Sequence, residues 1–171
     1  ASAVSKKILA YAKADRYNKI SNYPRYTPIN KDGYWYPTAP AYMAAVEPYF
    51  NTVRPFVLDS CSQFMAPPPV AFSTAKNSDF YKMMLANYSN SQQLSDEQKA
   101  IAAFWDCNPF AVKGDAHLIL SQKKISPGAH WLGITGIACA KAQKSFGQSM
   151  QIFTAVSMGL MDAFICCWHE K

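Results

Sequence analysis

The strongest candidate for binding chemistry is a lysine at the end of a long apolar stretch. On a helical wheel of about 100° per residue, Lys171 falls on the same side as a row of large apolar side chains, namely Phe153, Leu160, Phe164, Cys167 and Trp168. A lysine on such a face either extends its ammonium to water or points it into a site that binds an anion. Lys171 is therefore the candidate anion-binding residue.

Asp162 and His169 share the opposite side of the same predicted helix, because positions seven apart return to one face. A carboxylate and an imidazole in this register can form a polar pair between helices or part of a catalytic dyad. No third partner and no nucleophile accompany them, so we favour the polar pair and predict no catalytic residue in this chain. His117 and His130 are lone histidines without a positioned partner, and we expect structural roles for both.

The five cysteines form no Cys-x-x-Cys pair. Cys61, Cys107 and Cys139 lie in apolar neighbourhoods, where a free cysteine behaves as a small buried hydrophobe. Cys166 and Cys167 are adjacent in a helical stretch, where a bridge between them would be strained. We therefore expect neither a disulfide scaffold nor a metal site.

The charge pattern limits the classes of partner. A formal net charge of +6 permits contact with anions, but the 17 Lys and Arg residues are scattered and form no basic run. This pattern argues against nucleic-acid binding. The best candidate for a membrane span, Ile152 to Trp168, is short and contains Asp162, so we expect a buried core helix and no span. The Ala-Ser-Ala start is typical of a processed chain and favours a periplasmic or secreted location.

Helical periodicity dominates, and the predicted fold class is all-α. We treat residues 1–171 as a single helical region, with a helix over 1–20, a proline- and aromatic-rich wrap over 21–76 and helices over 77–171. The wrap contains Tyr34-Trp35-Tyr36, and disordered linkers are poor in such rings. We expect the wrap to be ordered, with its rings laid over the helices, rather than to expose them for binding.

Capping signals place the helices of the second half. Asn77 or Ser78 can cap the first, and Ser95 with Gln98 fits a capping box for the second, which ends before Pro109. We expect a third helix from about His130 to Lys144, whose Gly133, Gly136 and Ala140 allow another helix to approach closely, and a fourth from near Gly147 to Lys171. That last helix has no stop signal, so the fold is predicted to be incomplete.

Six stretches, in order along the chain, resemble the vanadium-dependent haloperoxidase-related proteins of the type 2 phosphatidic acid phosphatase superfamily. They are Asn51–Leu58, Pro67–Thr74, Asn77–Lys82, Leu94–Ile101, Gly128–Trp131 and Met161–Lys171. The resemblance covers residues 30–171 and implies the N-terminal helical portion of such a protein. In that superfamily a helical bundle holds phosphate or vanadate without a metal cation from the protein.

By this resemblance, the lysine that ends Cys-Trp-x-x-Lys opens the first anion-binding motif and corresponds to Lys171. The Arg-Pro, Pro-Ser-Gly-His and Ser-Arg/His elements that should follow are absent. Arg54-Pro55 and the segment ending at His130 imitate two of these elements but precede Lys171. We therefore expect no cofactor in this chain alone, and vanadate only in the intact protein.

The resemblance implies the segment of a phosphatase-like or haloperoxidase-like enzyme that acts on a phosphate ester or a halide. Its catalytic motifs would lie beyond this chain, and its main partner would be the rest of the same polypeptide. The alternative is a stand-alone helical binding or scaffold module that uses exposed aromatic rings, such as Trp35 and Tyr36, for carbohydrate or protein contacts.

Overall fold

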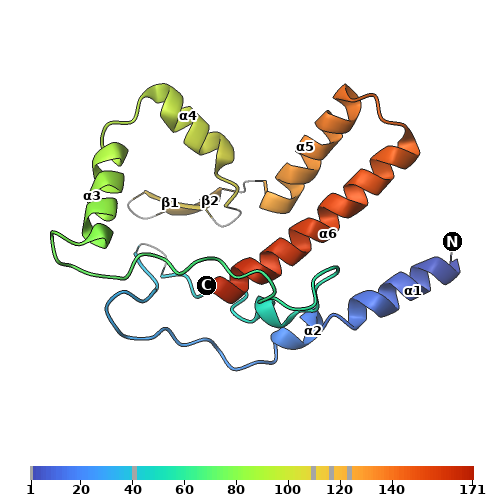
Figure 1. Cartoon of the computed structure of the whole chain (residues 1–171), viewed down its shortest axis with the longest axis horizontal. Helices are drawn as coiled ribbons and strands as arrows, with labels where there is room; N and C mark the ends of the chain where they lie inside the picture. Colours follow the sequence, from blue (N-terminus) through green and yellow to red (C-terminus); the bar gives the residue numbers. More distant parts are fainter. Residues whose placement is uncertain (1, 40–41, 109–110, 116–117, 123–124) are drawn as a thin grey trace. The chain divides into compact units, whose positions relative to one another are not determined.

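The computed structural model describes the chain except residues 1, 40–41, 109–110, 116–117 and 123–124 (Figure 1). The chain is predominantly helical, which confirms the predicted all-α class. The helices are α1 (Ser2–Lys13), α2 (Tyr17–Ile20), the 3₁₀ helix η1 (Phe50–Thr52), α3 (Asp79–Ser91), α4 (Asp96–Trp105), α5 (Pro127–Lys141) and α6 (Phe146–Glu170). The strands are β1 (Ala111–Asp115) and β2 (Leu118–Gln122).

The chain divides into two compact units. The first unit comprises Ala1–Thr27, Tyr42–Ala66 and Gly128–Lys171, and the second comprises Pro28–Ala41 and Pro67–Pro127. The first unit therefore contains the candidate residue Lys171. The treatment of residues 1–171 as one region of a larger domain stays a prediction.

The helix expected over residues 1–20 is interrupted. It forms as α1 and α2, and the break comes at Arg16, whose backbone is left-handed with φ 76°. The Asp15 carboxylate accepts the backbone N–H of Tyr17 at 2.8 Å. A short acidic side chain that binds the backbone two residues on favours a turn over a continuing helix. Helical periodicity alone does not show this local competition, so the prediction of one helix over 1–20 is wrong at Arg16.

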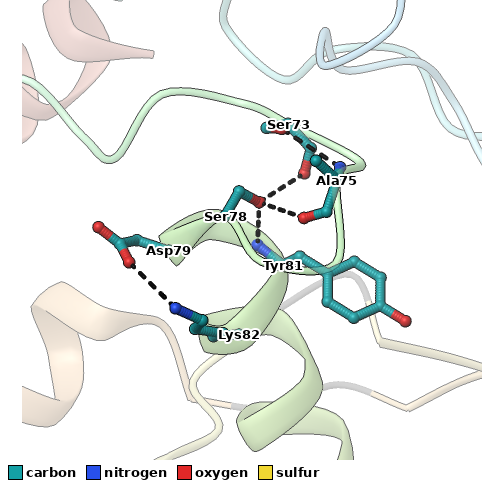
Figure 2. A network of polar contacts seen from close by, with 6 residues as sticks. All are labelled: Ser73, Ala75, Ser78, Asp79, Tyr81 and Lys82. Atoms are coloured by element: carbon teal, nitrogen blue, oxygen red, sulfur yellow. Dashed lines mark hydrogen bonds and ion pairs between the residues drawn. The ribbon is translucent and has the colours of Figure 1, made fainter.

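Side-chain caps begin three of the helices. The Ser78 hydroxyl accepts the N–H of Tyr81 at 3.2 Å and donates to the carbonyl of Ala75 at 2.7 Å, while Asp79 and Lys82 pair at 3.9 Å along the first turn of α3 (Figure 2). Ser95 and Gln98 form the predicted capping box of α4. The same arrangement of Ser145 and Gln148 begins α6. Each cap satisfies amides that the helix itself leaves unpaired.

A small antiparallel hairpin interrupts the helical pattern of the second unit. Strand β1 pairs with β2, with Ala111 opposite Gln122 and Asp115 opposite Leu118. The all-α prediction contains no strand, whereas residues Ala111–Asp115 form β1. Five-residue runs are too short for periodicity to separate strand from loop.

The hydrophobic core that positions the candidate site is small. Ile20, Val53 and Ile165 are buried together, with Tyr49, Phe50, Cys61 and Met161 packed against them. This cluster joins α2 and η1 to the C-terminal half of α6.

The rest of α6 is largely exposed in this chain, so the expected buried core helix is wrong for the 171 residues by themselves. Only Asp162 and Ile165 of α6 are buried. By length and composition α6 is the one described helix that could cross a membrane, but a single such helix is weak evidence of a span. Of the small residues on α5, Gly136 lies near α6, because a Cβ there would meet the Phe153 ring at 3.6 Å.

The aromatic wrap is only partly laid over helices. Phe72 packs edge-on against Phe80 of α3, with ring centroids 5.1 Å apart. Tyr34, Trp35 and Tyr36, however, expose 46%, 50% and 66% of their surface. The expectation that these three rings are buried is therefore wrong for this chain.

Candidate functional site

The C-terminal half of α6 is held against the segment 42–66 by a buried carboxylate. Asp162, 5% exposed, accepts three consecutive backbone N–H groups, from Phe56 at 2.6 Å, Val57 at 2.8 Å and Leu58 at 3.1 Å. Burying a carboxylate is costly unless it is hydrogen-bonded, and three N–H donors satisfy this one. Asp162 thereby fixes the rotation of α6 and its position along the helix axis, two and a half turns before Lys171.

Two further contacts anchor the last turn of α6. The indole N–H of Trp168 donates to the carbonyl of Val46 at 2.9 Å, and the Glu170 carboxylate accepts the N–H of Ala66 at 3.1 Å. The Trp168 ring also packs against Phe164 and Phe50, with centroids 5.5 and 6.0 Å away. The end of α6 is therefore held by contacts with Val46, Phe50 and Ala66.

Lys171 follows this anchored turn. Its backbone N–H donates to the carbonyl of Cys167 at 3.2 Å, so it continues the helical turn as the C-cap of α6. Its ammonium lies 4.3 Å from the centre of the Trp168 ring, within the range of a cation–π interaction. The residue is exposed. The ammonium is thus held at the end of the apolar face and stays accessible to an anion.

The described residues do not by themselves complete an oxyanion site. A tetrahedral oxyanion needs several donors around its oxygens. Within the described part of the chain, the Lys171 ammonium contacts the Trp168 ring. The described residues also contain no group of three or more metal-ligating side chains.

The other candidate residues have structural partners. In the described chain no hydrogen bond joins Asp162 to His169, because the Asp162 carboxylate binds the backbone of 56–58 instead. Arg54 donates to the carbonyl of Tyr11 at 2.9 Å, and its guanidinium lies 3.7 Å from the centre of the Tyr11 ring, so it ties α1 to the segment 42–66 within the first unit. His130 lies in the first turn of α5, as expected, whereas His117 lies outside the described residues.

None of the five cysteines forms a disulfide in the described chain. Burial raises the pKa of the Cys166 thiol, and Cys61 and the carboxylates of Asp162 and Glu170 raise it further. A raised pKa keeps the thiol protonated and unreactive near neutral pH.

Comparison with known proteins identifies the relationship. No protein-family profile and no curated protein sequence matches the chain. A solved structure does match: a bacterial vanadium-dependent iodoperoxidase is 40% identical, superimposes with a TM-score of 0.83, and is matched over 98% of this chain and 40% of its own. The chain therefore spans less than half the length of that protein. On this fold and sequence identity, the chain belongs to the vanadium-dependent haloperoxidase-related superfamily.

Proposed function

We propose that this chain is the N-terminal helical segment of a phosphate- or vanadate-binding enzyme of the haloperoxidase type, and that Lys171 is its contribution to the anion site. The single observation that carries the proposal is the match to the iodoperoxidase over nearly the whole chain. The remaining anion ligands and the catalytic motifs would come from the rest of the polypeptide.

The position of Lys171 supports this role. Trp168 holds the ammonium over its ring at 4.3 Å, and the anchors at Asp162 and Glu170 fix the helix that carries it. A preorganised cation stabilises an anion better than a flexible one, because less side-chain freedom is lost on binding.

The exposed apolar faces of α5 and α6 support the rest of the polypeptide as the main partner. Ile137 on α5 is 60% exposed and Met150 on α6 is 51% exposed. Met150 and Met158 also line a shallow groove along α6 with Gln151, Thr154 and Ala155. Exposed apolar side chains grouped along a helix favour a contact with another part of a protein.

The proposal is tested by activity assays on the full-length protein. We expect vanadate-dependent oxidation of iodide by hydrogen peroxide, or hydrolysis of p-nitrophenyl phosphate that vanadate inhibits. Residues 1–171 alone should show neither activity, because they supply one candidate ligand. Turnover by residues 1–171 alone, or neither activity in the full-length protein, would overturn the proposal.

The alternative is a helical binding or scaffold module, and the exposure of Tyr34, Trp35 and Tyr36 favours it. Large hydrophobic side chains are exposed throughout the described chain, so both functions are compatible with an exposed Trp35. Acrylamide quenching of Trp35 in the full-length protein separates the two functions. If the parent protein and Trp35→Phe have the same acrylamide-quenchable fluorescence, the remaining polypeptide covers the Trp35 ring. A loss of quenchable fluorescence in the variant favours the binding module.

A further inference from the structure

A pocket of about 350 Å³ lies in the first unit and does not include Lys171 among its lining residues. Residues 17–26 and 44–49 form its walls. Its volume falls in the range of small-molecule sites, which are mostly apolar with a few polar groups. The aromatic lining residues are Tyr17, Tyr23, Tyr26 and Tyr49, and the charged ones are Arg25 and Glu47.

Specific contacts hold three of the four tyrosines. The Tyr49 hydroxyl donates to the carbonyl of Pro24 at 2.7 Å, and the Tyr23 and Tyr49 rings pack edge-on with centroids 5.2 Å apart. Tyr17 packs against Phe50 at 6.0 Å, and its hydroxyl donates to Glu47 at 2.9 Å. The pocket wall is therefore formed before any ligand binds.

Glu47 supplies the negative charge of the pocket. It is half-buried, and one carboxylate oxygen accepts the Tyr17 hydroxyl. For the second oxygen no partner is recorded within the described residues. Its backbone is left-handed, with φ 50°, which is uncommon outside glycine and is often found where a side chain serves a site.

We infer that this pocket binds a small organic cation, an ammonium group carried on an aromatic body. The negative faces of tyrosine rings attract a cation, and the aromatic body stacks on the same rings. The second Glu47 oxygen accepts an N–H of the ammonium. Arg25 also lines the pocket and repels a cation, but its side chain is exposed and water screens its charge.

The test compares three probes of one shape and different charge: benzylammonium, benzyl alcohol and benzoate. Each probe is titrated into the full-length protein, and binding is followed by the NMR chemical shifts of the protein. We expect benzylammonium to bind most tightly, with a Kd on the order of 1 mM for a ligand of this size. Equal affinity for the three probes, or a preference for benzoate, would overturn the inference.

Substitutions assign the preference to the pocket. Glu47→Gln keeps the acceptor for Tyr17 and removes the charge, so benzylammonium should bind about two- to fivefold more weakly. Arg25→Gln should leave its affinity unchanged or raise it. Glu97→Gln, an exposed change in α4 outside the pocket, is the matched control and should have no effect.

A second variant, Tyr17→Phe, tests the role of Glu47 without replacing Glu47 itself. Tyr17→Phe releases both Glu47 oxygens, so benzylammonium should bind at least as tightly as before. Weakened binding in this variant while its circular dichroism is unchanged contradicts the role given to Glu47. Lys171→Ala should leave benzylammonium binding intact, which separates this inference from the proposed anion site.

Discussion

The buried carboxylate of Asp162 accepts the backbone N–H of Val57 at 2.8 Å across 105 positions of the sequence. With the neighbouring N–H groups of Phe56 and Leu58, this contact fastens α6 to the segment that also carries Val53 of the core. The helix that presents Lys171 is therefore positioned by a backbone contact rather than by apolar packing alone.

Replacing Asp162 by Asn should destabilise the protein by about 2–3 kcal/mol. The amide keeps one acceptor oxygen but turns an NH₂ group toward backbone donors, which leaves part-buried N–H groups unpaired. Urea unfolding monitored by circular dichroism measures the loss. Asp32→Asn, at an exposed site, is the control and should change stability by less than about 0.5 kcal/mol. A loss no larger than that of the control would show that the contact contributes little.

Gly33 should tolerate no side chain. Its φ is 85°, and an added Cβ would lie 2.7 Å from the Phe72 ring. We expect Gly33→Ala to destabilise the second unit by about 1–3 kcal/mol, through backbone strain and the displaced ring. Gly159→Ala is the contrasting change, because nothing lies within 4 Å of its added Cβ in α6. It should stabilise the helix by about 0.5–1 kcal/mol, so opposite signs in thermal unfolding are expected.

Tyr17 should ionise at higher pH than an ordinary tyrosine. Its hydrogen bond to Glu47 raises the pKa above 10.0, and the charge of Glu47 and burial raise it further. Because the pKa is raised in the folded state, the contribution to stability is complete below pH 10 and is lost as the pH rises through the folded value. Absorbance titration at 295 nm, compared with Tyr17→Phe, measures this. The difference between the titration curves of the parent and Tyr17→Phe should show Tyr17 ionising with a midpoint above pH 10. A midpoint at or below pH 10 would contradict the hydrogen bond to Glu47.

The Trp168 indole should contribute to stability through its N–H. Trp168→Phe keeps a ring between Phe164 and Phe50 but leaves the carbonyl of Val46 without its donor. We expect a loss of about 1–2 kcal/mol in urea unfolding. Tyr88→Phe, at a ring of α3 that is 63% exposed, is the control and should cost less. A loss at Trp168 no larger than that of the control would show that its hydrogen bond contributes little.

Local signals predicted much of the fold. The Ser95–Gln98 capping box and the Ser78 cap are encoded within four residues, so the sequence was sufficient to place them. The Ser145–Gln148 box has the same spacing and could have been found in the same way. The resemblance also indicated the superfamily, which the comparison with the iodoperoxidase supports.

The contacts of the site could not be predicted, because they join residues far apart in the chain. Helical spacing placed Asp162 and His169 on one face, but no periodic pattern shows that Asp162 binds the backbone of 56–58. Trp168 likewise reaches Val46 through a single distant hydrogen bond. The prediction that Trp35 and Tyr36 are buried was also wrong, because composition does not say how much apolar surface one chain can cover.

Vanadate affinity of the full-length protein tests the central claim most directly. Isothermal titration should give a Kd that rises about 10- to 100-fold in Lys171→Ala, because a charged hydrogen-bond donor to the anion is lost. Lys141→Ala, at the end of α5, should bind vanadate like the parent protein. Equal affinities of the parent and Lys171→Ala would contradict the role assigned to Lys171.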